Sequence, residues 1–276
     1  MANKTKLRSL INVAGVGLEI GPSFDPVVAK REGHRVEVLD HLSASDLRRK
    51  YQHADHVDLS QIEEVDYVSD GGSILELIGK RGHYDYIVAS HVIEHTVDLL
   101  GFLSDCQHLL KPDGILALAI PDTRFSFDCL RPLSSTGLVL QAHLEKGNRH
   151  AVGKMFDELA YNCLRQGAIA WPSHASGPLS FFRPLAEAWA IMEQYQHSEL
   201  FLDIHAWQFT PSSFRLIASD LFELGQMTLR EQFFEDSNDR EFFVALSGSG
   251  RGCPVSRIEL AQRAVHELRA IITQSA

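Results

Sequence analysis

The chain has 276 residues, of which 45% are hydrophobic and 22% charged, and these proportions are ordinary for a soluble globular protein. Its 26 basic and 36 acidic residues give a net charge of −10, which argues against a nucleic-acid partner because phosphate binding needs a basic face. The sequence contains neither a run of about 18 apolar residues nor an apolar signal segment after the first residues, so we expect no membrane partner.

A glycine turn follows the first predicted strand. Residues 1–13 are predicted to form a short helix that leads into a buried strand over 17–20. Gly21 then permits a sharp strand-to-helix turn and lets a ligand approach the main chain. The pair Asp25–Pro26 offers an N-cap acceptor and a first-turn proline, so it predicts the start of a helix. Nucleotide-like ligands often lie over such a turn in a doubly wound sheet.

This turn differs from the dinucleotide-binding fingerprint. That pattern requires Gly-x-Gly-x-x-Gly, whereas Gly21 is followed by Pro22 and Ser23 and the later glycines are missing. Pro22 also lacks the backbone N–H that a pyrophosphate would use. Glu19, just before the turn, would repel a pyrophosphate and attract an ammonium or sulfonium group. The turn therefore favours a cationic ligand.

Strands and helices alternate over the following residues, which is typical of a parallel sheet with crossover helices. A second strand over 35–40 ends at Asp40, about 20 residues after the glycine turn. The later elements predicted here are a third strand with its loop over 65–71, a fourth strand over 84–91, a helix over 98–110, a turn over 111–114 and a fifth strand over 115–120.

The order and spacing of these segments resemble those of the class I S-adenosylmethionine-dependent methyltransferases, whose first motif is an acid-x-Gly turn. The resemblance covers roughly residues 14–125, and the segment from Ile93 to His95 is similar to the fourth motif of one subgroup. It implies an α/β fold with a Rossmann-like, seven-stranded, mostly parallel sheet and helices on both faces. It also implies S-adenosyl-L-methionine as the methyl donor and S-adenosyl-L-homocysteine as the product.

By the same resemblance, residues at the strand ends bind the cofactor. Asp40 would hold the ribose hydroxyls, and Asp70 would lie near the adenine amino group, with the neighbouring Asp66 as an alternative. Ser90 and His91 end the fourth strand, close to the reactive centre in this fold. The complete predicted cofactor site consists of Glu19, Gly21, Ser23, Asp40, Asp70, Gly71, Ser90 and His91.

The segment from His91 to His95 has several interpretations. Formally it is His-x-x-Glu-His, the inverted zinc-protease motif, but that motif needs one long helix and this segment follows a strand directly. Glu94 and His95 could instead bind a divalent cation, or they could make structural hydrogen bonds across the loop. Because an imidazole titrates near neutral pH, we predict His95 or His91 as a catalytic general base and assign no metal site.

Polar residues after the fifth strand predict the acceptor site. Asp122, Arg124 and Arg131 belong to a Pro-Asp-x-Arg-x-x-Phe-Asp-x-x-Arg-Pro pattern. This pattern looks like a subgroup of bacterial methyltransferases linked with glycan and secondary-metabolite pathways. The guanidinium groups could clamp a carboxylate or phosphate of the acceptor, or they could form salt bridges with Asp122 and Asp128 that anchor the next segment. His205 is predicted to reach the same pocket, and the alternative is that Trp207 packs there while His205 makes local hydrogen bonds.

The break in the strand–helix rhythm after residue 122 suggests an insertion. A stretch of about 80 residues is long for a loop, so we expect it to fold as a helical cap that shapes the acceptor site. The predicted parts are a cofactor-binding core over 1–122, the cap over 123–205, a return to the sheet over 206–250 and a C-terminal helix within 251–276. Within them we predict helices over 154–165, 184–196, 210–224 and 256–273, and strands over 227–234 and 241–246.

The last helix has an apolar face that we expect to pack on the body, with a dimer contact as the alternative. Its apolar residues are Ile258, Ala261, Val265, Leu268 and Ile272.

The sequence therefore predicts methyl transfer to a small-molecule acceptor. A hydroxyl of a sugar or secondary metabolite is the first choice, because the histidine-rich fourth motif supplies a base. The alternatives are N-methylation of a small amine, a methyltransferase-like binding subunit without turnover, and a nucleotide-linked dehydrogenase. Four scattered cysteines without paired spacing favour the cytoplasm. We expect a monomer or homodimer in bacterial biosynthesis.

Overall fold

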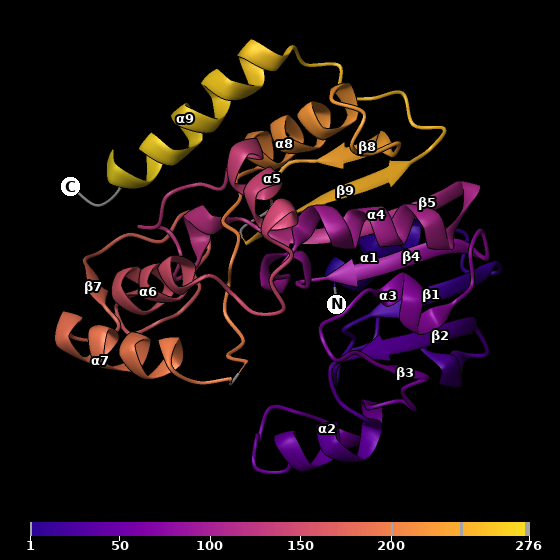
Figure 1. Cartoon of the computed structure of the whole chain (residues 1–276), viewed down its shortest axis with the longest axis horizontal. Helices are drawn as coiled ribbons and strands as arrows, with labels where there is room; N and C mark the ends of the chain where they lie inside the picture. Colours follow the sequence, from indigo (N-terminus) through magenta and orange to yellow (C-terminus); the bar gives the residue numbers. More distant parts are fainter. Residues whose placement is uncertain (1, 200, 238–239, 274–276) are drawn as a thin grey trace.

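The computed structural model describes residues 2–199, 201–237 and 240–273. Its centre is a seven-stranded sheet (Figure 1). The strands are β1 Val16–Ile20, β2 Arg35–Asp40, β3 Tyr67–Val68, β4 Tyr84–Ser90, β5 Leu110–Pro121, β8 Arg230–Glu235 and β9 Glu241–Ser247. They lie in the order β3-β2-β1-β4-β5-β9-β8. Strands β1 to β5 are parallel and β9 is antiparallel to both its neighbours, so the predicted Rossmann-like fold is confirmed.

Helices cover both faces of this sheet. Those of the core are α1 Ala2–Ser9, α2 Ala44–Tyr51, α3 Ile74–Ile78, α4 Leu99–Leu109, α8 Pro211–Glu223 and α9 Arg257–Thr273. Buried residues of α3, α4 and α8 form one large cluster with β1, β4, β5 and β9. Leu7 of α1 belongs to a second cluster on the opposite face, together with Tyr86 and Ala117. The alternation of side chains along each strand produces these two layers.

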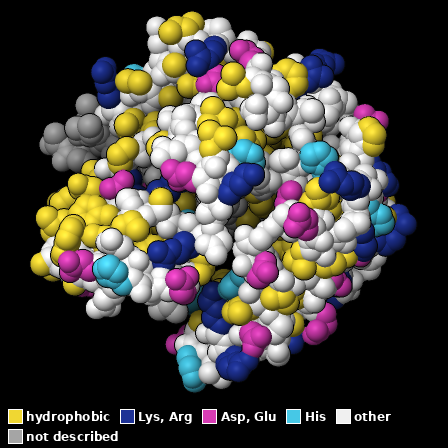
Figure 2. Space-filling view, viewed as in Figure 1, with side chains coloured by type: hydrophobic (Ala, Val, Ile, Leu, Met, Phe, Trp, Pro, Cys, Tyr) yellow, Lys and Arg dark blue, Asp and Glu magenta, His cyan; other side chains and the backbone are white. Residues whose placement is uncertain are grey.

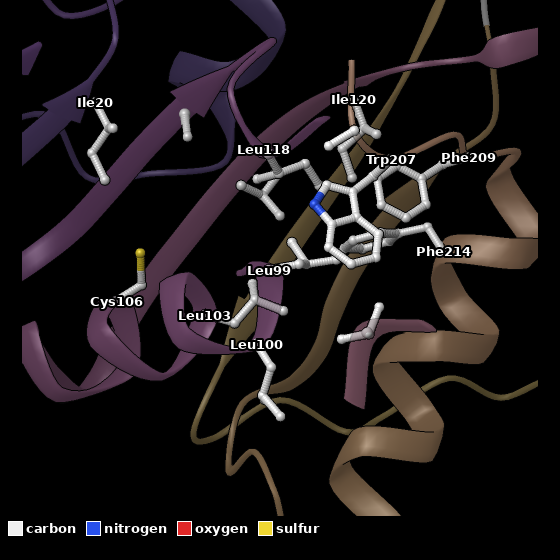
Figure 3. Close-up of a cluster of buried hydrophobic side chains, with 14 of the residues drawn as sticks. Ile20, Leu99, Leu100, Leu103, Cys106, Leu118, Ile120, Trp207, Phe209 and Phe214 are labelled. Atoms are coloured by element: carbon white, nitrogen blue, oxygen red, sulfur yellow. The ribbon is translucent and has the colours of Figure 1, made fainter. Parts of the chain in front are cut away.

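The large cluster joins the sheet to the region after the cap. Leu99 and Leu103 of α4 lie against Leu118 of β5, and Trp207 lies beside them (Figure 3). Trp207 is 1% exposed, and its indole N–H donates to the Thr96 carbonyl at 2.6 Å. The segment that leaves the cap is therefore fixed to the end of the fourth strand.

The cap segment lies beside the carboxyl ends of the parallel strands (Figure 1). It contains α5 Thr136–Glu145, α6 Val152–Tyr161, α7 Leu185–Gln196 and an antiparallel pair, β6 Cys163–Arg165 and β7 Leu179–Phe181. Helix α5 lies against the core helices α4 and α8, and α6 and α7 lie farther out (Figure 1). We predicted no strand here, and the helix expected over 154–165 ends at Tyr161, because the chain turns there to pair with β7. The helix over 184–196 is confirmed, and α5 was missed.

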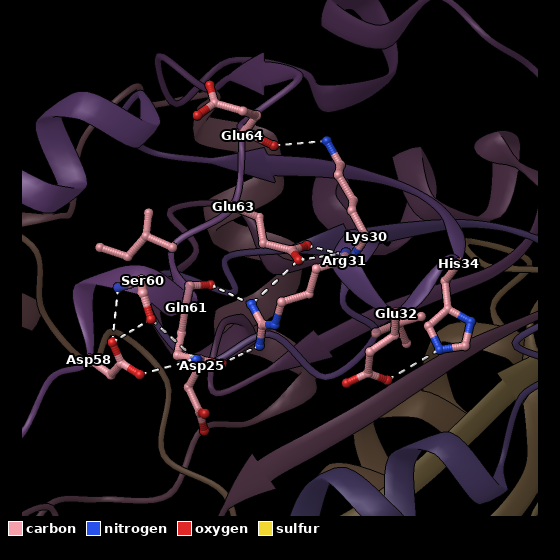
Figure 4. A network of polar contacts seen from close by, with 12 residues as sticks. Asp25, Lys30, Arg31, Glu32, His34, Asp58, Ser60, Gln61, Glu63 and Glu64 are labelled. Carbon is pink, nitrogen blue, oxygen red and sulfur yellow. Dashed lines mark hydrogen bonds and ion pairs between the residues drawn. The ribbon is translucent and has the colours of Figure 1, made fainter.

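The helix expected at Asp25–Pro26 is absent among the described residues. The backbone N–H groups of Val27 and Val28 donate to the Glu19 carboxylate, and only a 3-10 turn over Lys30–Glu32 follows. Glu63 accepts the N–H groups of Lys30 and Arg31 and holds this turn in place (Figure 4). The carboxylates of Glu19 and Glu63 therefore accept the backbone N–H groups at the start of the segment where a helix was expected.

Two further boundaries differ from the predictions. The turn expected over 111–114 lies inside β5, which starts at Leu110 and has an irregular register opposite Tyr84–Tyr86. The third strand is reduced to Tyr67–Val68. Helix α4 and the capped start of α8 at Thr210 agree with the predictions.

The predicted packing face of the last helix is partly wrong. Leu260 and Ala264 are buried on α9, which contacts α8, whereas Ile258 and Val265 are 68% and 51% exposed. The buried stripe is therefore rotated relative to the predicted one, and the Ile272 side chain lies outside the described residues.

Large apolar side chains are exposed on the outer surface of the cap. Figure 2 shows hydrophobic side chains gathered over α6 and α7, where Phe182, Leu185 and Trp189 are each more than half exposed. Among the described residues, no helix has the length and apolar character needed to cross a membrane.

Candidate functional site

The glycine turn brings three strand ends together. Ile20 of β1 pairs with Leu39 of β2 and with Ala89 of β4, so the next residue in each strand lies at the same edge of the sheet. Gly21 has a φ of +65° and donates its N–H to the Leu39 carbonyl at 2.8 Å. A Cβ added at Gly21 would lie 2.9 Å from the Val92 side chain. Only glycine fits this turn without strain.

Asp40 ends β2 directly beside the turn. Its carboxylate accepts the Ser23 N–H at 2.8 Å through Oδ2, while Oδ1 contacts the N–H and ring Nδ1 of His41 at 2.7 and 2.6 Å. The Asp40 side chain is buried, whereas that of His41 is 52% exposed. The half-exposed His41 ring is therefore the outer partner of the Asp40 carboxylate, and a ligand hydroxyl that donates to Oδ1 would take its place.

Glu19 occupies a different place from the one predicted. Its side chain is buried, and Oε1 and Oε2 accept the N–H groups of Val27 and Val28 at 2.5 and 2.8 Å. Burial raises the pKa of this carboxyl to about 7, against the lowering effect of the two hydrogen bonds. Both oxygens are therefore engaged within the protein, and Glu19 shapes the loop behind the turn instead of facing a ligand.

The remaining predicted cofactor residues lie along the same edge. Ser23 has a φ of +52°, and its hydroxyl donates to the Tyr51 hydroxyl at 3.0 Å. Asp70 and Gly71 are exposed in the loop after β3, which the Ser69 N–H ties to the Asp40 carbonyl. Ser90 is the last residue of β4.

A buried carboxylate lies just beyond the end of β4. Ile93–His95 form a 3-10 turn, and its central residue, Glu94, is 0% exposed. Neither carboxylate oxygen of Glu94 has a hydrogen-bond partner among the described residues. The nearest ionisable atoms are His91 Nδ1 at 3.6 Å and His95 Nε2 at 3.8 Å from its Oε1. A buried carboxylate without hydrogen-bond partners is costly, so Glu94 is a candidate for a functional role.

Both histidines of this segment are held by acidic residues. His91 Nε2 lies 2.8 Å from Glu241, and His95 Nδ1 lies 2.8 Å from Asp203. Burial disfavours the imidazolium form of each, but these hydrogen bonds and the Glu94 charge outweigh it. They raise the pKa of His91 and raise that of His95 to about 9.

His205 completes this cluster from the far end of the cap. The backbone N–H groups of Ala206 and Trp207 both donate to the Glu94 carbonyl, at 2.7 and 3.1 Å. The His205 ring lies edge-on to that of His95, and its Nδ1 is 2.5 Å from Asp128. Burial opposes ionisation of Asp128, but the charge and hydrogen bond of His205 prevail and lower the pKa of this carboxyl.

The predicted arginine clamp is used internally. Arg124 binds both oxygens of Asp122, and Arg131 Nη1 contacts Asp128, Glu158 and the carbonyl of His205. Asp122 and Arg131 are both buried. The salt-bridge alternative therefore describes these groups: they anchor the start of the cap.

Several polar residues near the cluster were missed. Asp203 carries no motif and reaches His95 only through the fold. His150 and Lys154 have ring and ammonium nitrogens that are buried without hydrogen-bond partners among the described residues. Burial, aided by nearby positive charge, lowers the pKa of His150 to about 4 and that of Lys154 to about 7. Sequence pattern gives no signal for these groups, since their burial arises from cap packing.

A cavity of about 180 Å³ lies elsewhere, between α8 and β8. Its lining includes Arg215, Phe222 and Cys253 and none of the predicted site residues. The polar cluster at the strand ends is therefore the better candidate for chemistry.

The comparison with protein families identifies residues 7–197 as a methyltransferase domain. This match covers the glycine turn, the Glu94 segment and most of the cap.

Curated relatives match over shorter stretches. A ubiquinone biosynthesis O-methyltransferase of Rhodopseudomonas palustris is 36% identical over 77 residues, which is 28% of each chain. The protein of the same name from Bradyrhizobium diazoefficiens is 30% identical over 109 residues, or 40% of this chain and 39% of the relative. The chain thus matches well under half the length of these relatives.

Solved structures similar to this chain include an S-adenosylmethionine-dependent methyltransferase from Mesorhizobium loti. It is 11% identical with a TM-score of 0.47, and the match covers 89% of this chain and 97% of that one. Another is a 1,6-didemethyltoxoflavin-N1-methyltransferase from Burkholderia thailandensis, at 10% identity and a TM-score of 0.42, covering 89% and 76%.

Proposed function

Because the chain belongs to the methyltransferase domain family, we propose that it transfers a methyl group from S-adenosylmethionine to a hydroxyl oxygen of a small acceptor. The single observation that carries the choice of oxygen is the buried Glu94 carboxylate, unpaired among the described residues and flanked by histidines. An alcohol must lose its proton as it attacks, and this cluster offers groups that receive one.

The strand-end residues fit the methyl donor. Gly21 makes the sharp turn with a positive φ, and the Asp40 carboxylate has a half-exposed histidine as its outer partner. Replacement of the His41 contact would give Asp40 the ribose hydroxyls, while Ser90 and the loop at Asp70 and Gly71 border the same edge. The donor supplies an electrophilic methyl group on a sulfonium. Glu19 supports this site through Val27 and Val28.

His91 and His95 are the proposed proton acceptors, and each accepts a proton only in its neutral form. Because the pKa of His95 is raised to about 9, we expect the transfer rate to increase as the pH rises toward that value. Each ring has one nitrogen bound to a carboxylate and the other directed toward Glu94. Such a bond orients the imidazole and stabilises the imidazolium after it takes the proton. Glu94 adds a negative charge at a distance of less than 4 Å.

The acceptor would enter between the cluster and the cap. Arg131 and Asp128 form an ion pair at the start of the cap. His205, at the end of the cap, bonds to the same Asp128 and places its ring against that of His95. Positioning of the acceptor against the methyl donor is the main source of rate in such a displacement. The relatives named as O-methyltransferases support an oxygen acceptor.

The test is a transfer assay with methyl-labelled S-adenosylmethionine and a panel of phenols, sugars and amines. We expect label in hydroxyl-bearing acceptors and none without enzyme. Transfer confined to amines would overturn the oxygen assignment. Binding of S-adenosylhomocysteine without transfer to any member of the panel would favour a binding subunit.

A further inference from the structure

Three side chains converge at the centre of the candidate site. One ligand-type atom each from Glu94, His95 and His205 lies within 4.8 Å of the other two. Glu94 and His95 are neighbours in the turn after β4, and tertiary packing brings His205 to them from the segment that leaves the cap. We propose that these residues bind one divalent transition-metal ion through a carboxylate oxygen and two imidazole nitrogens.

The first argument is that the Glu94 carboxylate lacks hydrogen-bond partners. Its side chain is 0% exposed, and neither oxygen is hydrogen-bonded within the described part of the chain. A carboxylate buried in this way needs a cation, a metal or donors, because desolvation is otherwise uncompensated. The proposed ligand His95 has its Nε2 3.8 Å from Glu94 Oε1, and His91 Nδ1, outside the triad, lies at 3.6 Å; both distances exceed hydrogen-bond distance. The candidate ligand atoms around Glu94 are therefore close together but not hydrogen-bonded to one another.

The second argument is the support behind each histidine. His95 Nδ1 bonds to Asp203 at 2.8 Å, and His205 Nδ1 bonds to Asp128 at 2.5 Å. Metal-binding histidines commonly donate their other N–H to a carboxylate, which fixes the tautomer and the ring orientation. In both residues this leaves Nε2 as the ligand nitrogen. Asp128 is in turn fixed by Arg131 at 2.6 Å.

The ligand chemistry selects the ion. Two imidazoles and one carboxylate suit zinc and its first-row neighbours, whereas magnesium and calcium prefer oxygen ligands. Tetrahedral ligand atoms about 2.1 Å from zinc lie about 3.4 Å from one another. The observed 3.8 Å between His95 Nε2 and Glu94 Oε1 requires only a small rotation of either side chain. Three protein ligands leave a further position open.

The role of this ion rests on the proposed function. An ion with an open position would lower the pKa of an acceptor hydroxyl that approaches it. The acceptor oxygen then bonds to the methyl carbon as the carbon–sulfur bond breaks, and the hydroxyl proton passes to a base. With His95 as a ligand, His91 remains as that base, since it lies outside the triad.

Titration of tag-free, chelator-treated protein with Zn²⁺ tests the proposal by calorimetry. We expect one ion per chain, and at least tenfold weaker binding in both Glu94→Gln and His205→Gln. Asp128→Asn should weaken binding by about 10- to 100-fold through loss of support for His205. His108→Ala is the matched control, because its exposed ring bonds, within the described part of the chain, to the Ser104 carbonyl of its own helix alone.

Two further readouts make the result decisive. Co²⁺ bound in the triad should give visible absorption that Glu94→Gln abolishes. Binding of S-adenosylhomocysteine by each variant shows that it is folded, and His205→Gln serves if Glu94→Gln fails this check. The proposal is overturned if wild type binds no stoichiometric Zn²⁺, if Mg²⁺ binds more tightly, or if folded variants bind Zn²⁺ as wild type does. If protein that binds no metal still transfers methyl groups, the metal site is wrong and the proposed methyltransferase function stands.

Discussion

The ring of His205 lies edge-on to the ring of His95, with the centroids 4.7 Å apart and the planes at 89°. One histidine follows β4 and the other follows the cap, and two backbone hydrogen bonds to the Glu94 carbonyl join the two segments. The cap is thereby tied to the end of the sheet at the point where we place methyl transfer. The predictions below test the residues at this junction and the turn beside it.

Replacement of the proposed bases should slow turnover and spare cofactor binding. Loss of a general base reduces rate by about 10²- to 10⁴-fold, so we expect this loss in His91→Ala. His95→Ala should lose at least as much, because it removes a ring that borders Glu94 and that serves as a metal ligand if the triad binds an ion. Labelled-methyl transfer gives the rate, and calorimetry with S-adenosylhomocysteine gives the affinity.

His143→Ala is the control for these variants. It removes a similar pair, since His143 Nδ1 lies 2.8 Å from Asp98, but His143 is outside the cluster. Rates of His91→Ala and His95→Ala equal to that of the control would mean that both histidines are structural.

Substitution of Gly21 by alanine should disturb the turn. The φ of +65° disfavours any other residue by about 1–2 kcal/mol, and the new Cβ would press on Val92. We expect a lower melting temperature and weaker S-adenosylhomocysteine binding. Gly153→Ala, within α6 where a Cβ meets open space, should be neutral or stabilising. Equal effects of the two substitutions would contradict our account of the turn.

The buried Glu19 predicts an unusual dependence of stability on pH. Burial raises its folded-state pKa from 4.5 to about 7, so the folded protein binds a proton in this interval that the unfolded chain has released. Its contribution is full below pH 4.5 and is lost as the pH rises through about 7. The wild type should therefore gain up to about 3 kcal/mol relative to Glu19→Gln on acidification through this range. Urea unfolding at several pH values measures the difference.

Glu37, on the neighbouring strand β2, should show the opposite sign. Burial opposes its ionisation, but hydrogen bonds from Lys80 and Tyr84 outweigh this and lower its pKa below 4.5. Its stabilisation is therefore present above pH 4.5 and is lost as the pH falls through the lowered value. Glu37→Gln should be less stable than wild type at pH 7, and the gap should close in acid. A gap that widens in acid would refute the assignment.

The individual strands of the core were predictable because hydrophobic strand segments and turn residues are local signals, whereas the seven-stranded sheet was expected from the family resemblance. The periodicity of α4 and the Thr210–Pro211 start of α8 are local signals of the same kind. The helix at Asp25–Pro26 failed for a non-local reason: Glu19, on the preceding strand, captures the N–H groups of Val27 and Val28. A local N-cap signal does not produce a helix when a buried carboxylate binds the backbone N–H groups of the first turn.

The candidate site was predictable in part. Asp40 and His91 follow from their places at strand ends, and His205 was placed near the acceptor pocket from its position after the cap. The burial of Glu94 and the support from Asp128 and Asp203 depend on how the cap folds back. The ion pairs of Arg131 also depend on how the cap folds. The sequence alone therefore could not decide whether Arg131 binds the acceptor or forms internal salt bridges.

Calorimetric titration with S-adenosylhomocysteine tests the central claim most directly, on wild type, Asp40→Ala and the control Asp58→Ala, which removes an exposed turn cap. We predict one binding site per chain, unchanged affinity in the control, and a loss of about 1–3 kcal/mol in Asp40→Ala. No binding by wild type, or equal affinity in all three proteins, would contradict the placement of the methyl donor at the end of β2.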